Sequence, residues 1–188
     1  MTQAVARRWL KVVDPTALTA RETLRHALGY GKTVTGVSRS EVIAFLWTGT
    51  VDAREVLDRL VHDTNLLQNP NKHHLEIAVG TESLRPRGNA WVLVSREGDG
   101  ASLGETLLRR RLVRGDAPET ARGTLWELSL EGTPEERHRL ARAMAVTRGR
   151  ASGLLSNPHV EDATVFEAAP SAEELVAALG LASRPSAT

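Results

Sequence analysis

The segment LLQNPN at residues 66–71 recurs as LLSNPH at residues 154–159, shifted by 88 positions along the chain. In both places a helix-like apolar pattern precedes the segment and a strand-like run follows it. Asn-Pro ends a helix, because proline cannot donate a backbone hydrogen bond and moves the preceding residue out of the α region. Two copies of one stop signal predict two copies of one structural unit.

Further matches lie upstream at a slightly smaller shift. Residues 22–24 (ETL) return at residues 105–107, and Gly49-Thr50 returns as Gly132-Thr133, both shifted by 83 positions. Trp9 and Trp91 each stand at the head of an apolar run, at a shift of 82. The change from 83 to 88 places about five extra residues in the second copy, near residues 147–152.

This repeat predicts a tandem duplication. We expect a first copy at residues 1–80, a linker at 81–89, a second copy at 90–168, and a short helix with a disordered tail at 169–188. Domains of about 80 residues bury only about 60–65% of the surface that their unfolded chains expose. The two copies should therefore share an interface.

The composition excludes several kinds of site. The chain has no cysteine, which rules out disulfides, thiolate metal sites and a cysteine nucleophile. Its 24 basic and 23 acidic residues give a net charge of +1, so no nucleic-acid surface is expected. No apolar run approaches the length of a membrane span, and residues 1–10 are too few for a secretory signal. We expect a cytoplasmic protein that binds neither nucleic acid nor membranes.

Strands and helices alternate regularly in the first copy. Strands are expected at residues 9–13, 34–37, 42–47 and 75–79, and a turn at 38–40 would join the middle two as a β-hairpin. Helices are expected to begin at Thr19, with Glu22 three places on, and at Asp52, with Glu55 three places on. The resulting order, β-α-β-β-α-β, is that of a ferredoxin-like unit.

The second copy repeats this order. Strands are expected at residues 90–95, 125–130 and 160–167, and helices at Ser102 with Glu105 and at Thr133 with Glu136. Residues 171–179 predict a short capped helix, and residues 182–188 predict disorder. The predicted fold class is α+β: two tandem ferredoxin-like domains that form a pseudo-two-fold intramolecular dimer.

Few residues suggest chemistry. Gly98-Asp99-Gly100 precedes a helix, but a turn explains it better than a phosphate loop does. His73 and His74 are neighbours on a strand, so they point to opposite faces and do not form a shared metal site. Residues 109–111 are three arginines in the last turn of a helix, where cations complement the helix dipole. The single histidines on charged helices are expected to face solvent: His26, His62 and His138. We therefore predict no catalytic residue, no metal and no cofactor.

Several short motifs occur together in a fixed order. They are Asp14-Pro15, HALGY at 26–30, VTGV at 34–37, VIAF at 42–45, LWEL at 125–128 and LLSNPHVED at 154–162. In these motifs each half of the chain resembles PurS, the small subunit of bacterial phosphoribosylformylglycinamidine synthase (formylglycinamide ribonucleotide amidotransferase). The resemblance covers roughly residues 8–167. Members of that family are usually single domains that dimerise, whereas this chain holds two.

The resemblance also suggests where partners would bind. Family hairpins usually carry a Gly-Lys pair, and this chain has Ser40-Glu41 and Gly123-Thr124 in its place. The last motif contains an asparagine in each copy. The partner interface implied by the resemblance consists of Ser40, Glu41, Asn69, Gly123, Thr124 and Asn157.

The resemblance implies a non-catalytic bridging subunit in purine biosynthesis. It would hold a glutaminase subunit and an ATP-using synthetase subunit together for the transfer of ammonia. Further association of copies of this chain stays open. The alternative is a small-molecule sensor of the ACT type, which shares the predicted order of elements and places amino-acid ligands at the interface between paired domains. Fold alone does not separate the two.

Overall fold

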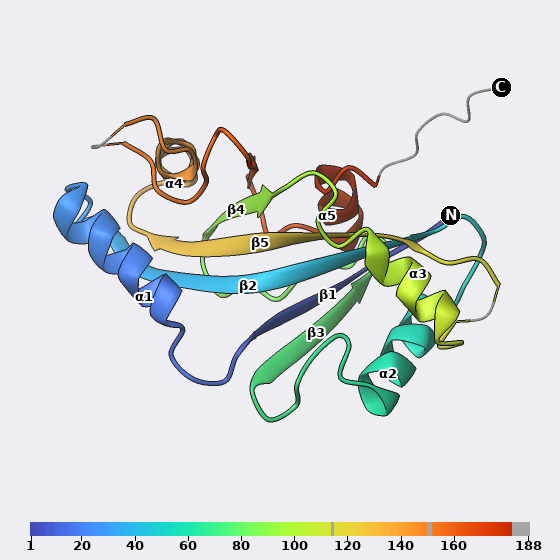
Figure 1. Cartoon of the computed structure of the whole chain (residues 1–188). Helices are drawn as coiled ribbons and strands as arrows, with labels where there is room; N and C mark the ends of the chain where they lie inside the picture. The colour runs from blue at the N-terminus through green and yellow to red at the C-terminus, as the bar shows by residue number, and fades with distance from the viewer. Residues whose placement is uncertain (114, 150–151, 182–188) are drawn as a thin grey trace, which may run out of the picture.

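The computed structural model describes residues 1–113, 115–149 and 152–181. In this part of the chain, six strands form one antiparallel sheet in the order β3-β1-β2-β5-β4-β6 (Figure 1). The fold is α+β, as predicted. The strands are β1 (Thr2–Leu10), β2 (Val34–Trp47), β3 (His73–Val79), β4 (Ala90–Ser95), β5 (Glu119–Leu130) and β6 (Asp162–Phe166).

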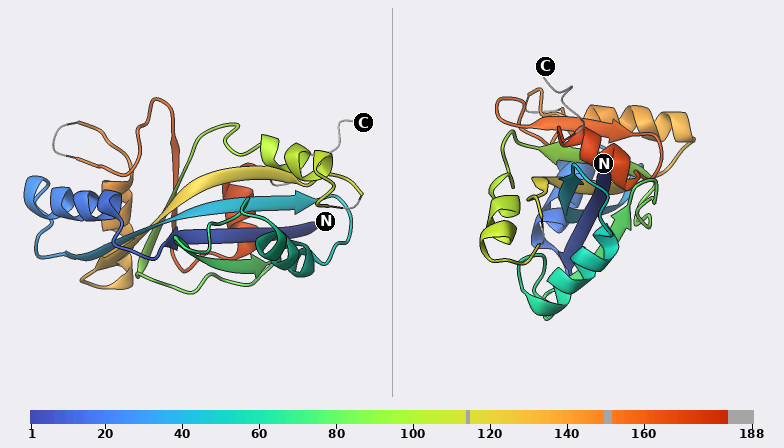
Figure 2. Two further views of the ribbon diagram at one scale, coloured as in Figure 1. Left: turned by 60° about the horizontal axis from the view of Figure 1, so that its bottom comes forward. Right: turned by 90° about the vertical axis from the view of Figure 1, so that its right-hand side faces the viewer.

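Helices pack on both faces of the sheet. α1 and α4 lie over one end of one face, α2 and α3 lie over its other end, and α5 packs against the opposite face (Figure 1 and Figure 2). The π-helix η1 continues α1 without a break. The helices are α1 (Pro15–Glu22), η1 (Thr23–Ala27), α2 (Ala53–Asp63), α3 (Ser102–Arg109), α4 (Pro134–Ala145) and α5 (Ala172–Ala178).

The β-hairpin predicted within residues 34–47 is wrong, because β2 crosses this segment as one strand of 14 residues. The expected turn at residues 38–40 is paired with β5, through Ser38↔Glu127, Arg39↔Trp126 and Ser40↔Leu125. This long ladder satisfies the backbone groups of the segment, which a local turn would leave to solvent. Each half therefore contributes three strands, and a β-α-β-β-α-β order is not observed in the described residues.

The helix starts are correct in three cases and wrong in two. Thr133 and Ser171 form capping boxes with Glu136 and Glu174, and the Asp52 side chain accepts from the N–H of Glu55. The first helix starts one turn before Thr19, because Asp14 accepts from two backbone N–H groups and Pro15 occupies the first helical position. α3 has Ala101 at its N-cap, so Ser102 with Glu105 makes no capping box.

Some boundaries of the predicted elements also move. β1 begins at Thr2 rather than at residue 9, and β5 begins at Glu119 rather than at residue 125. The early part of β1 is buried between β2 and β3, a long-range environment that local sequence does not reveal. The predicted helix at residues 171–179 is confirmed as α5, and the tail at residues 182–188 lies outside the described residues.

We call the face that carries α1, α2, α3 and α4 the helix-bearing face, and the face that carries α5 the opposite face. Each end of the helix-bearing face is built from both halves of the sequence. One core joins α1 and η1 to α4, and the other joins α2 to α3. Buried side chains from these helices are Ala17, Ala20, Leu24, Ala141 and Met144 in the first core, and Leu57, Leu60, Leu103 and Leu107 in the second. Burying each large apolar side chain contributes about 1.5–3 kcal/mol. Neither half can therefore complete a core alone.

A fragment of residues 1–83 should not fold as a monomer. It would expose the edge of β2 that pairs with β5, and α1 would lose its packing against α4. Size-exclusion chromatography with circular dichroism should find the fragment either unfolded or self-associated. A well-folded monomeric fragment would contradict this prediction, and the full chain serves as the folded control.

On the opposite face, the connection between β3 and β4 runs beside α5. The backbone N–H of Leu84 donates to the carbonyl of Pro170 at 3.1 Å, and the Leu84 side chain is buried beside Leu175 and Val176. Gly88 lies against β5, where an added Cβ would stand 2.6 Å from the carbonyl oxygen of Leu128. Only glycine allows this close approach.

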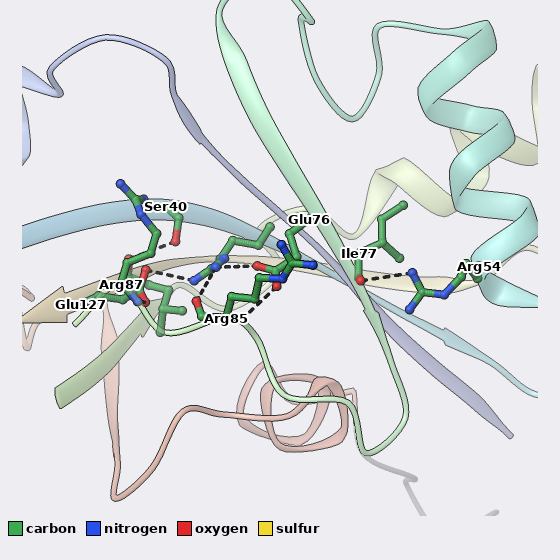
Figure 3. Close-up of polar contacts among 9 residues, drawn as sticks. Ser40, Arg54, Glu76, Ile77, Arg85, Arg87 and Glu127 are labelled. Carbon is green, nitrogen blue, oxygen red and sulfur yellow. Dashed lines mark hydrogen bonds and ion pairs between the residues drawn. The ribbon is translucent and has the colours of Figure 1, made fainter. Parts of the chain in front are cut away.

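A buried ionic cluster fixes this connection to the sheet (Figure 3). Arg7 of β1, which is 1% exposed, forms ion pairs with Glu76 of β3 and Glu127 of β5. Each glutamate also accepts a backbone N–H from the connection at 2.9 Å: Glu76 from Arg85, and Glu127 from Arg87. The cluster joins the first half, the connection and the second half.

Replacing Arg7 with methionine should destabilise the fold by about 3–5 kcal/mol, because Glu127 would keep a buried charge without its ion-pair partner. Urea denaturation measures this change in the free energy of unfolding. Arg54→Met is the matched control, since Arg54 pairs with Glu82 at the surface, where loss of an ion pair costs about 1 kcal/mol or less. Equal losses in both variants would contradict the structural role of the cluster.

Candidate functional site

A polar cleft crosses the middle of the helix-bearing face, between the two helix pairs. Its volume is about 740 Å³, and its floor is formed by β1, β2 and β5. Four of the six predicted interface residues line it: Ser40, Glu41, Gly123 and Thr124. Its other charged or imidazole side chains are Arg8, Asp14, Arg39, His73, Arg96, Glu97, Asp99, Arg122 and Glu161.

Only two of those four predicted residues can turn their side chains into the cleft. Side chains alternate between the faces of a strand, and Glu41 and Thr124 are paired on the helix-bearing face. The Ser40 hydroxyl donates to the carbonyl of Leu125 at 3.4 Å, on the opposite side of β2. At Gly123 an added Cβ would meet Leu179 at 2.8 Å, so this residue faces the segment after α5.

An ion pair between Arg8 and Glu41 lies on the floor of the cleft. Nη2 of Arg8 lies 2.9 Å and 2.7 Å from the two carboxylate oxygens of Glu41. Nη1 of Arg8 donates to the carbonyl of Leu67 at 2.9 Å. The same guanidinium therefore joins β1 to β2 and holds the repeated LLQNPN segment against the sheet.

Two further arginines face the cleft along the same strands. Nε of Arg39 donates to Asp14 at 2.9 Å, and its guanidinium lies 6.0 Å from the centre of the Trp126 ring. Arg122 is weakly paired: its Nη1 is 3.8 Å from Glu41, and its Nε is buried without a hydrogen-bond partner in the described residues. The cleft thus contains both satisfied and unsatisfied charges.

Asn69 and Asn157 lie outside the cleft and shape the turns in which they stand. The Asn69 side chain accepts from the N–H of Asn71 at 3.0 Å, and the Asn157 side chain accepts from the N–H of His159 at 3.1 Å. Asn157 also donates its own N–H to Glu161 at 2.8 Å. These contacts explain why the same residue type recurs at both turns.

His73 stands between the Asn69 turn and the cleft. Its Nδ1 accepts the backbone N–H of Asn69 at 3.1 Å, which requires that nitrogen to be unprotonated. Burial lowers the pKa of His73 below its ordinary value of 6.5, and the positive charges of Arg8 and Lys72 lower it further against the opposing effect of Glu41. His74 points to the other face and contacts the ring of Trp9, as the alternation of the strand predicts.

The arginines of the cleft are not among the site residues predicted from the sequence. Arg39 and Arg122 are separated by 83 positions, the same shift that relates the other repeated residues, so comparing the copies residue by residue would have found them. Arg8 carries no such signal. The turn at residues 98–100 is confirmed as a turn, and its Gly98 and Asp99 line the cleft.

These groups can hold a polar partner through ion pairs and hydrogen bonds. Among the described residues, no three histidine or acidic side chains are grouped as metal ligands would be. Within the same part of the chain, no helix has the length and apolar character to cross a membrane. No protein-family model matches this chain, and no curated protein does.

The lowered pKa of His73 predicts a loss of stability in mild acid. The unfolded chain takes up a proton near pH 6.5 and the folded chain only at lower pH, so this contribution to stability is complete above 6.5 and falls as the pH drops below it. His73→Gln should reduce the loss of unfolding free energy between about pH 7.5 and 5.5. Urea denaturation at both pH values measures it, with the exposed His62→Gln as control. An unchanged pH dependence in His73→Gln would contradict the assignment.

Proposed function

We propose that this chain is a bridging subunit of a phosphoribosylformylglycinamidine synthase complex, holding a glutaminase and an ATP-using synthetase together in the cytoplasm. It would consist of two PurS-like units in tandem, related by a pseudo-two-fold axis as a covalent dimer. Each unit would correspond to a ferredoxin-like unit in which one long strand replaces the central hairpin. The chemistry would belong to the partners.

The register at the centre of the sheet supports a two-fold relation. Glu41 pairs with Thr124, Arg39 pairs with Trp126 and Ile43 pairs with Arg122. At the repeat shift of 83 positions, Arg122 is the residue equivalent to Arg39, and Thr124 is the residue equivalent to Glu41. The strands on either side follow in matching order, β1 then β3 on one side and β4 then β6 on the other.

One observation carries the bridging role: two matching sets of three strands joined at their centre by β2 and β5. A bridge needs two separate docking surfaces held at a fixed distance, and such a sheet offers one in each half. The repeated Asn-Pro turns lie in different halves, after α2 and after α4 (Figure 1). We assign one turn to each partner.

The activity of the reconstituted complex tests the bridge. Glutamine-dependent turnover should fall by at least about tenfold when this chain is omitted from a mixture of glutaminase and synthetase, because ammonia would be diluted into solvent rather than delivered. Turnover with free ammonia should stay within about twofold, since the synthetase would keep its own chemistry. Equal loss with both nitrogen donors, or no loss, would refute the bridging role.

Charged substitutions on the two turns should separate the partners. Asn71 and His159 are exposed, and each stands two residues after the asparagine that shapes its turn. Asn71→Glu and His159→Glu should therefore each weaken co-elution of a different partner. Thr19→Glu, on the exposed side of α1, is the matched control and should leave both partners bound. Retention of both partners by both variants would exclude the turns as docking sites.

A further inference from the structure

The cleft holds cationic groups that the fold leaves incompletely satisfied. A guanidinium has five N–H donors. Within the residues described, Arg39 uses only its Nε in a hydrogen bond. The Arg122 side chain makes no hydrogen bond there, and its Nη1 lies 3.8 Å from Glu41. Arg8, by contrast, makes three hydrogen bonds, two to the Glu41 carboxylate and one to the carbonyl of Leu67.

These two arginines reach the cleft from both halves of the chain. Arg39 belongs to β2 and Arg122 to β5, and they stand on either side of the central Glu41↔Thr124 pair. The guanidinium of each retains donors in the planar arrangement that matches carboxylate and phosphate oxygens. The cleft therefore offers guanidinium donors to an oxyanion from both sides of this pair.

The rim beside Arg122 carries free negative charge. Glu97 and Asp99 lie in the turn between β4 and α3 and line the cleft, and their carboxylates form no hydrogen bond or ion pair with the described residues. The carbonyl of Asp99 accepts the N–H of Arg122 at 2.8 Å, which fixes the turn next to that arginine. The cleft thus places free acceptors next to free donors.

We propose that the cleft binds a small molecule with an oxyanion at one end and an amino or similar donor group at the other. The carboxylate or phosphate binds Arg39 and Arg122, and the donor group binds Asp99 and Glu97. Thr124 supplies a hydroxyl between them. A volume of about 740 Å³ lies within the usual range of ligand sites, about 300–1,000 Å³.

This inference goes beyond the bridging role and does not depend on it. Binding of a small molecule needs only this chain, whereas bridging needs both partner subunits. A calorimetric experiment on the purified chain therefore tests the ligand site alone. Failure of the site would leave the reconstitution experiment unaffected, and failure of the reconstitution would leave the site unaffected.

The experiment is isothermal titration calorimetry of the full chain with two matched pairs of probes. L-Glutamate is compared with glutarate, and AMP with ribose 5-phosphate, so that each pair differs in the donor end. In at least one pair, the probe with both ends should bind about tenfold or more tightly than its partner. The pair that responds distinguishes a carboxylate ligand from a phosphate ligand.

Variants then locate the two ends of the bound probe. Arg122→Gln and Arg39→Gln should each weaken the binding of the tighter-binding probe about tenfold or more. Asp99→Asn should reduce the difference in affinity between that probe and the other member of its pair. Arg142→Gln, an exposed arginine on α4, is the control and should bind as the unaltered chain does. Circular dichroism confirms that each variant is folded.

Several results would overturn the proposal. They are no binding of any of the four probes, equal binding within both pairs, or equal weakening in Arg142→Gln and Arg122→Gln. If Arg122→Gln were unfolded, Arg39→Gln would carry the same test from the other half of the chain. Unchanged binding in a folded Arg39→Gln variant would also overturn the proposal.

Discussion

The antiparallel ladder between β2 and β5 is the contact on which the rest of this structure depends. It runs from Val34↔Leu130 to Leu46↔Glu119 and joins two three-stranded halves into one sheet. Because both strands extend beyond their own halves, α1 comes to lie beside α4 and α3 beside α2. The same ladder places Arg39, Glu41, Arg122 and Thr124 in a single cleft.

Charged side chains are buried on one face of the sheet and lie in an open cleft on the other. On the face with α5, the buried Arg7 pairs with the buried Glu127 and the half-buried Glu76, and the backbone N–H groups of Arg85 and Arg87 complete the cluster. Such a cluster gives a defined geometry, because any misplacement leaves a buried charge unpaired. The helix-bearing face keeps its charged side chains in an open cleft, where they contact solvent.

Local sequence predicted the parts of this fold that local interactions control. The caps at Asp52, Thr133 and Ser171, strand β4, and the opposed side chains of His73 and His74 follow from short-range spacing. The hairpin failed because residues 38–40 find partners in β5, far along the chain. Glu41 and Thr124, expected at a partner interface from the family resemblance, line the cleft, but their role there stays a prediction. Arg8 was not predicted, since its place depends on a register that only the assembled sheet defines.

The central ladder also has a consequence for biosynthesis. β2 leaves the ribosome long before β5, whose last pairing residue is Leu130. During synthesis of the intervening chain, β2 therefore lacks the strand with which it forms its longest ladder. An unpaired strand edge invites association with other chains, and folding dominated by distant contacts is slow. Newly made protein should therefore depend on chaperones that shield residues 34–47 until translation has passed the second half.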